Sequence, residues 1–118
     1  MTIYISLPIT GHDPEERKAT AEAARQILQK NPDFFVVTPF DIGESVEAVD
    51  PGAGYSDYMK EDVAYIIDYA DAVCFLVDPA VTDSKGVKLE YHTARIYGKK
   101  IMRLIGGKVY YYERKALD

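Results

Sequence analysis

The residues with the clearest capacity for chemistry in this sequence lie in residues 83–90, where a serine and a glycine precede a glutamate as Ser84-x-Gly86-x-x-x-Glu90. The segment follows the apolar residues 72–77, which are typical of a buried strand, and it opens an expected helix. Ligands of open α/β sheets bind in the crevice outside the carboxyl ends of the strands, so a glutamate there is well placed to react. Glu90 is therefore the first candidate for a catalytic residue.

Helical geometry places Glu90 at the flank of a buried face, about 60° from Val87, because residues advance about 100° each around the axis. The face expected to pack on the sheet contains Val87, Tyr91, Ala94 and Gly98. Close to a helix N-terminus, the macrodipole favours a carboxylate by about 0.3–1 kcal/mol. We therefore expect the pKa of Glu90 to be lowered before any desolvation, and Glu90 to be ionised at pH 7, as a carboxylate nucleophile must be.

A structural role is the alternative for Glu90. In a capping box, the third helical residue returns a hydrogen bond to the N-cap backbone. With Ser84 as the N-cap this residue is Val87, and with Gly86 it is Leu89, so Glu90 belongs to neither box. A glutamate that only complements the helix dipole remains possible. The geometry alone leaves the catalytic and the structural interpretation open.

Asp62 repeats this relation on the preceding helix. It lies about 60° to one side of the expected inward face, on the same helical geometry. That face contains Met59, Val63, Ile66 and Ala70. The alternative is a solvated acid, because Asp57, Lys60 and Glu61 are close in sequence. A paired acidic site requires the two helices to meet at one crevice.

The segment Ser6-Leu7-Pro8-Ile9-Thr10-Gly11 suits a loop that lets a sugar or phosphate approach the backbone. A simple strand-to-helix turn explains it equally well, and it matches neither the dinucleotide nor the P-loop glycine pattern. His12 and His92 have no histidine or cysteine at ligand spacing, so we expect no metal site and no cofactor. Ser84 lacks the G-x-S-x-G elbow of serine hydrolases.

The elements that must position these residues alternate between strand and helix. We expect strands at 2–7, 34–37, 72–77 and 101–105, with a possible fifth at 109–112, and helices from 13 to about 30, at 56–69 and at 87–97. Residues 41–55 read as a long polar connection, which is usually functional or mobile. Apolar rather than alternating strands indicate a parallel sheet covered on both faces. The expected fold is α/β, a flavodoxin- or Rossmann-like three-layer sandwich with a four- to five-stranded parallel sheet.

Composition limits the function. The 118 residues suit a single domain, residues 1–118. A net charge of −5 does not fit binding to a nucleic acid polymer, which requires Lys and Arg at the phosphates. The only cysteine, Cys74, excludes an internal disulfide and suits a reducing cytoplasm, and neither a signal peptide nor a membrane-spanning run is apparent. We expect a cytoplasmic protein without a membrane partner.

Three segments together resemble the nucleoside 2-deoxyribosyltransferase-like superfamily: residues 3–11, the acidic helix at 58–62, and Ser84-x-Gly86-x-x-x-Glu90. The resemblance extends from residue 3 to about 105 and is closest to a small branch found in bacteria and phages. It implies that Glu90 attacks the anomeric carbon of a nucleoside or nucleotide and expels the base. It further implies that Asp62 assists at the sugar or the leaving base, with Glu61 as the alternative acid.

The resemblance also implies the substrate-binding residues, which are Tyr4, Ser6 and Gly11 on the first-strand wall and Ser84 and Gly86 on the sugar side. The expected function is cleavage or transfer of an N-glycosidic bond, with a small-molecule nucleoside or nucleotide as the partner. Several members of the superfamily complete their sites with a neighbouring subunit, so a homodimer or larger homo-oligomer is expected. The alternative is a non-catalytic module with the same fold that senses a nucleotide.

Overall fold

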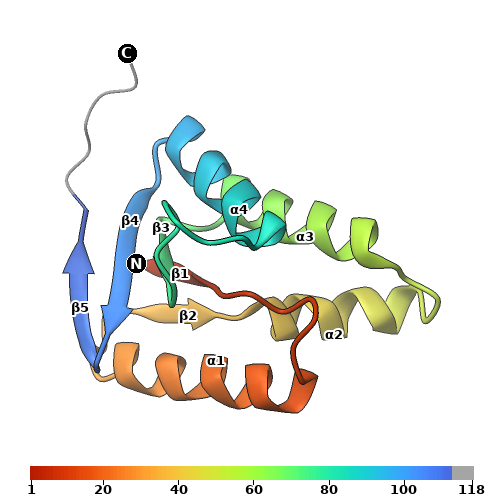
Figure 1. Ribbon diagram of the computed structural model, residues 1–118, viewed down its shortest axis with the longest axis horizontal. Coiled ribbons are helices and arrows are strands. Elements are labelled where there is room, and N and C mark those ends of the chain that lie inside the picture. Colours follow the sequence, from red (N-terminus) through yellow and green to blue (C-terminus); the bar gives the residue numbers. More distant parts are fainter. Residues whose placement is uncertain (113–118) are drawn as a thin grey trace.

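The computed structural model describes residues 1–112 and contains one five-stranded sheet (Figure 1). Its strands are β1 (Thr2–Ser6), β2 (Phe35–Val37), β3 (Ala72–Phe75), β4 (Lys100–Ile105) and β5 (Lys108–Tyr111), in the order β2-β1-β3-β4-β5. The first four are parallel, and β5 pairs antiparallel with β4. The expected α/β sandwich is confirmed, with four parallel strands and one antiparallel edge strand.

The turn between β4 and β5 explains why the fifth strand is antiparallel. Ile105 pairs with Lys108, so only Gly106 and Gly107 connect the strands. A two-residue connection can join antiparallel strands only, because parallel strands need a crossover of a dozen or more residues. Both glycines have positive φ, 55° and 79°, which is the conformation that the preferred two-residue hairpin turns require.

Helices cover both faces of the sheet. They are α1 (Pro14–Leu28), α2 (Pro39–Val49), α3 (Tyr55–Asp68) and α4 (Lys85–Ile96). Figure 1 shows α1 on one side of the sheet and α3 with α4 on the other. Among residues 1–112, the longest of these helices is too short and too polar to cross a membrane.

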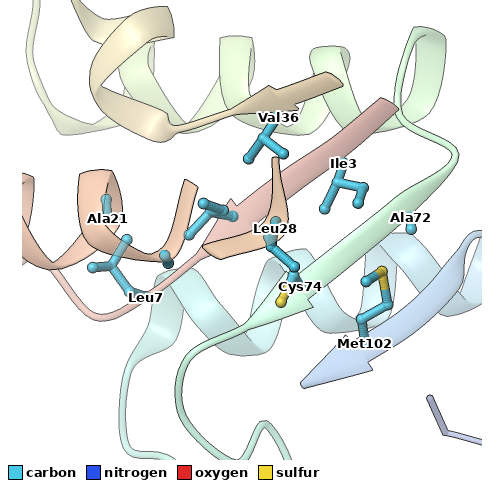
Figure 2. Packing of buried hydrophobic residues seen from close by; sticks show 10 residues of the cluster. Ile3, Leu7, Ala21, Leu28, Val36, Ala72, Cys74 and Met102 are labelled. Atoms are coloured by element: carbon cyan, nitrogen blue, oxygen red, sulfur yellow. The ribbon is translucent and has the colours of Figure 1, made fainter. Parts of the chain in front are cut away.

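Two buried apolar clusters form the core, one on each face of the sheet. The cluster on the α1 face is drawn in Figure 2 and contains Ile3, Ile5, Leu7, Ala21, Ala24, Leu28, Val36, Ala72, Cys74 and Met102. The cluster on the α3 and α4 face contains Tyr4, Ile66, Ala70, Val73, Phe75, Val87, Ala94 and Ile101. Adjacent residues of β1 thus alternate between the clusters, and this alternation points the Tyr4 side chain toward α3 and α4.

The expectation of a polar connection over residues 41–55 is wrong, because α2 occupies most of this segment. Thr38 caps this helix. Its side chain accepts from the Asp41 N–H at 3.3 Å, and the Asp41 side chain accepts from the Thr38 N–H at 2.9 Å. Pro39, which follows the strand expected at 34–37, is the first helical residue, where its missing N–H costs nothing. Gly43 within the segment concealed the helix from sequence reasoning.

The remaining helix boundaries lie close to those expected. Asp13, where the first helix was expected to begin, caps α1 through the Glu15 N–H, and the helix ends at Leu28 rather than near residue 30. Ser84 caps α4 through the Val87 N–H at 3.2 Å. Gly98 follows α4 with φ of 68°, which confirms its predicted place just past a helix.

The strand order fixes where a ligand can bind. From β1 the chain crosses to β2 on one side, and from β3 it crosses to β4 on the other. The direction of winding therefore reverses between β1 and β3, whose carboxyl ends are at Ser6 and Phe75. In doubly wound sheets this switch point is the place where a crevice opens.

Candidate active site

A cleft of about 1170 Å³ opens at this switch point. Its walls come from the loop after β1, the first turns of α1, α2, the N-terminal half of α3, and residues 82–86 at the start of α4. Three buried side chains, Tyr4, Asp62 and Glu90, also line it, and they form its floor. The volume is ample for a drug-sized or nucleoside-sized ligand.

Glu90 is fixed by two residues of β1. The Tyr4 hydroxyl donates to Glu90 Oε2 at 2.5 Å, and the Ser6 hydroxyl donates to Glu90 Oε1 at 2.8 Å. Glu90 is buried, with only 4% of its surface exposed. Each carboxylate oxygen therefore has its own donor, and the group has a single orientation at the base of the cleft.

Burial determines the charge of Glu90. Burial and then the nearby charge of Asp62 raise the pKa of this carboxyl to about 8, although the hydrogen bonds from Tyr4 and Ser6 act in the opposite direction. The expectation of an ionised Glu90 at pH 7 is wrong for the ligand-free cleft. The helix dipole is too weak to offset the loss of hydration that a buried carboxylate suffers.

Asp62 is a buried partner of Glu90 rather than a solvated acid. Asp62 is only 6% exposed. Burial raises its pKa to about 7, with the opposing effect of Tyr4 and the smaller contribution of Glu61 included. Glu61 itself is exposed, so Asp62 is the acid that reaches the floor of the cleft. The helices α3 and α4 thus meet at one crevice, as a paired acidic site requires.

Tyr4 connects the two carboxyl groups. Its phenol is fully buried, and its pKa is raised well above the usual value by burial and then by Glu90 and Asp62. The phenol therefore keeps its proton and donates a hydrogen bond to Glu90. Asp62 and Glu90 titrate as a coupled pair, since each carboxylate disfavours ionisation of the other. Asp62 has the lower pKa of the two, so in the ligand-free cleft Asp62 ionises first and Glu90 holds the remaining proton.

The structure brings three of the five candidate substrate-binding residues to the cleft, namely Tyr4, Ser84 and Gly86. Ser6 is fully buried and reaches the site through its hydrogen bond to Glu90 instead of through the cleft wall. Gly11 is exposed, has φ of 82°, and lies outside the wall. Its part in the fold is a turn that few other residues can adopt.

Gly86 lies against the N-terminal half of α3. A Cβ atom added at this position would be 3.6 Å from Met59 Sδ and 3.7 Å from the Tyr55 hydroxyl oxygen. These are ordinary contact distances, and the backbone at Gly86 is not in the left-handed region. The start of α4 therefore packs closely against α3 at Gly86, and neither the space nor the backbone there requires a glycine.

Sequence reasoning missed the wall formed by α2 and the start of α3. The cleft-lining residues of this wall include Phe40, Gly43, Glu44, Glu47, Tyr55, Tyr58 and Met59. Those on α2 were missed because residues 41–55 were taken as a connection. The signal that could have found them is the sequence Thr38-Pro39-x-Asp41, in which an aspartate takes the capping-box position usually held by glutamate or glutamine.

Side-chain contacts hold α2 in place at the cleft. Arg25 of α1 donates to Asp41 at 2.9 Å. Burial raises the pKa of Asp41, but the hydrogen bonds from the Arg25 guanidinium and the Thr38 backbone hold it below its usual value. Lys18 of α1 pairs with Glu44 at 3.4 Å.

Across residues 1–112, no group of three or more His, Cys, Asp and Glu side chains is arranged to hold a metal ion.

The fold and the cleft define a doubly wound α/β protein with a buried acidic pair at its switch point. Residues 1–103 match the family model described as "Domain of unknown function (DUF4406)", and the chain belongs to this family. No curated protein and no solved structure matches the chain significantly. The function of the chain must therefore be argued from the site itself.

Proposed function

We propose that this protein cleaves or transfers the N-glycosidic bond of a nucleoside or nucleotide through a glycosyl ester on Glu90. The observation that carries the proposal is the arrangement of the cleft floor. Glu90 is held there by Tyr4 and Ser6, with Asp62 beside it as a second buried acid. The likeness of Ser84-x-Gly86-x-x-x-Glu90 to the nucleoside 2-deoxyribosyltransferase-like superfamily supports the same chemistry.

In the first step, ionised Glu90 attacks the anomeric carbon while the bond from that carbon to the base nitrogen breaks. The electrons of that bond pass to the base, which takes a proton from Asp62. The products are a glycosyl ester on Glu90, the free base and an Asp62 carboxylate. Covalent capture divides one difficult displacement into two easier ones, and the carboxylate stabilises the developing oxocarbenium charge.

In the second step, water or another base attacks the same carbon and releases Glu90 as a carboxylate. Asp62 accepts the proton that the attacking nucleophile loses, so both acids return to their starting forms. Water as the acceptor gives a hydrolase, and a second base gives a transferase. General acid and base assistance of this kind contributes about 10²–10⁴-fold in rate.

In the ligand-free cleft Glu90 has the higher pKa, so these roles require the shared proton to move from Glu90 to Asp62 when substrate binds. Asp62, with a pKa of about 7, is protonated in a large fraction of molecules at neutral pH and can serve as the acid. Glu90 must be charged to attack, and the donors Tyr4 and Ser6 stabilise this charge. Developing positive charge on the sugar favours the same form, because it lies directly against the carboxylate.

The experiment is a panel of deoxynucleosides, ribonucleosides and their 5′-monophosphates, with free base measured by chromatography. Glu90→Gln keeps the size of the side chain and removes the nucleophile, so base release should fall below detection. Glu22→Gln is the matched control, since Glu22 is an exposed glutamate of α1 outside the cleft. Base release by Glu90→Gln at the wild-type rate would remove Glu90 from the mechanism.

A second candidate function is a module that binds a nucleotide without cleaving it. The observation favouring it is the protonation of Glu90, whose pKa of about 8 leaves it mostly uncharged at pH 7 in the ligand-free cleft. A neutral carboxyl is a hydrogen-bonding group rather than a nucleophile. Measurable binding of a nucleoside or nucleotide with no base release from any member of the panel would favour this function.

We further propose that the chain is a homo-oligomer. Several large apolar side chains of α4 and the residue after it are exposed, including Leu89 at 45%, Ile96 at 69% and Tyr97 at 54%. Contiguous exposed apolar surface often marks an interface. Light scattering after size exclusion at micromolar concentration should give at least twice the mass of the chain, and a strict monomer would contradict this.

A reducing cytoplasm is the proposed location. Cys74 is a buried free thiol in β3, and burial raises its pKa to about 12. Such a thiol is unreactive and gains nothing from an oxidising compartment. Fractionation of cells that express the tagged chain would test this location directly.

A further inference from the structure

A pair of residues on facing helices, Tyr58 of α3 and Glu47 of α2, forms one side of the cleft. The Tyr58 hydroxyl donates to Glu47 Oε1 at 2.8 Å. One turn earlier on α2, a Cβ atom added at Gly43 would be 3.5 Å from Tyr58 Cε1. Gly43 and Glu47 lie on the same face of α2, because they are four residues apart. The Tyr58 ring therefore packs against α2 at Gly43 while Glu47 holds its hydroxyl group.

The place of this pair relative to the acidic floor follows from α3. Tyr58 precedes Asp62 by four residues, which is about 6 Å along the helix axis. Both side chains line the cleft, so the Tyr58 and Glu47 pair lies about one helical turn outward from Asp62. This spacing is comparable with the width of a nucleobase. A base whose glycosidic nitrogen is near Asp62 would present its far edge to this pair.

The polarity of the pair decides what that edge can be. An ionised carboxylate only accepts hydrogen bonds. Glu47 Oε1 accepts the hydrogen bond from the Tyr58 hydroxyl, and among residues 1–112 no donor bonds to its Oε2. Lys18, a cation of the cleft wall on α1, is paired with Glu44. A ligand group at this position therefore gains most when it donates a hydrogen bond.

Resting on the proposed function, we infer that the Tyr58 and Glu47 pair recognises the base and selects its class. The favoured substrates are N-glycosides whose base carries an amino group on the edge away from the glycosidic nitrogen. Glu47 Oε2 accepts from this amino group, and the Tyr58 ring lies against the base. Glu47 is then a specificity-determining residue, separate from the chemical step at Glu90 and Asp62.

The test compares 2′-deoxyadenosine with unsubstituted purine 2′-deoxyriboside, which lacks only the amino group. The ratio of their kcat/KM values is measured for the wild type and for Glu47→Ala. The intrinsic reactivity of the two bases cancels when the two ratios are compared. We expect the ratio to fall about tenfold in Glu47→Ala, the size expected for a hydrogen bond to a charged group.

Two further variants make the comparison specific. Tyr58→Phe keeps the ring and releases Glu47, so the ratio should fall in the same direction by a smaller factor. Asp68→Ala is the control, because Asp68 is an exposed acid at the end of α3 outside the cleft, and its ratio should equal that of the wild type. Alanine is compatible with every helix involved. An unchanged ratio in Glu47→Ala would overturn the inference and leave the proposed function intact.

A binding experiment tests this inference separately from the proposed chemistry. The dissociation constants of the same two nucleosides are measured by calorimetry for Glu90→Gln, with and without Glu47→Ala. A preference for 2′-deoxyadenosine that is lost with Glu47→Ala supports base recognition even if no variant releases base. A preference that Glu47→Ala leaves unchanged, or no binding of either nucleoside, would overturn the recognition role of Glu47.

Discussion

Ser6 donates a hydrogen bond of 2.8 Å to Oε1 of Glu90, although 84 residues separate them in sequence. Ser6 is the last residue of β1, and Glu90 lies in the second turn of α4. Both are buried. This contact, with that of Tyr4, positions the carboxylate that the proposed mechanism uses as its nucleophile.

Replacing Ser6 with alanine should shift the pH dependence of the proposed base release. The hydrogen bond from Ser6 lowers the pKa of Glu90, so its loss raises that pKa. The rising limb of the kcat/KM profile should move to higher pH, and the rate at pH 7 should fall. Profiles from pH 5 to 9 measure this shift. An unchanged limb would mean that Ser6 does not influence the ionisation of Glu90.

Replacing Asp62 with asparagine should slow the release of neutral bases by about 10²–10⁴-fold, because asparagine cannot protonate the leaving nitrogen. A nucleoside of 7-methylguanine already carries a positive base that needs no proton. Its cleavage should lose much less rate in Asp62→Asn. Equal losses for neutral and cationic bases would indicate that Asp62 acts on the sugar rather than on the base.

The stability of the fold should decrease as the pH rises from about 4.5 to about 8. The pKa values of Glu90 and Asp62 are raised to about 8 and about 7, so in this range the folded state binds more protons than the unfolded state. The stabilisation that Glu90 and Asp62 contribute is therefore fully present below their pKa values in the unfolded chain. It is lost as the pH rises through their pKa values in the folded protein. Each group contributes a slope of at most about 1.4 kcal/mol per pH unit.

Urea unfolding at several pH values measures this dependence. Glu90→Gln carries no titrating group at this position, so its free energy of unfolding should fall less steeply between pH 5 and pH 8. The control Glu22→Gln should follow the wild type. Parallel curves for Glu90→Gln and the wild type would show that burial of Glu90 does not raise its pKa in solution.

The capping box of α2 should contribute measurably to the free energy of unfolding and should hold in place the wall of the cleft that α2 forms. Thr38→Ala removes the acceptor of the Asp41 N–H and should lower the free energy of unfolding by about 0.5–2 kcal/mol. Ser45→Ala, on the exposed part of the same helix, is the control. Denaturant titration checks the prediction. A loss in Ser45→Ala equal to that in Thr38→Ala would argue against a specific capping effect.

Much of the fold could be predicted because its signals are local. The Asp13 cap, the glycine after α4 and the apolar strands each depend on residues close together in sequence. The α2 helix was missed because Gly43 and the polar residues after it resemble a connection, and its stability comes from the cap at Thr38 and from packing against α3. Local propensity was overridden by tertiary contacts.

The candidate site was predictable in part for the same reason. The position of Glu90 after a strand pointed to the crevice, and the offset of Asp62 pointed to the same place. The sequence could not reveal the degree of burial, which sets the pKa of Glu90 and reverses the expected charge state. Nor could it reveal that Ser6 contacts Glu90 from behind the cleft, because that contact depends on how β1 and α4 pack.

A covalent glycosyl ester on Glu90 can be observed by mass spectrometry of the protein quenched in acid during turnover of a cleavable nucleoside. We expect a mass increase equal to the glycosyl group, located on the peptide that contains Glu90 and absent in Glu90→Gln. Base release by Glu90→Gln at the wild-type rate, or a glycosyl group on any other residue, would contradict the proposed mechanism.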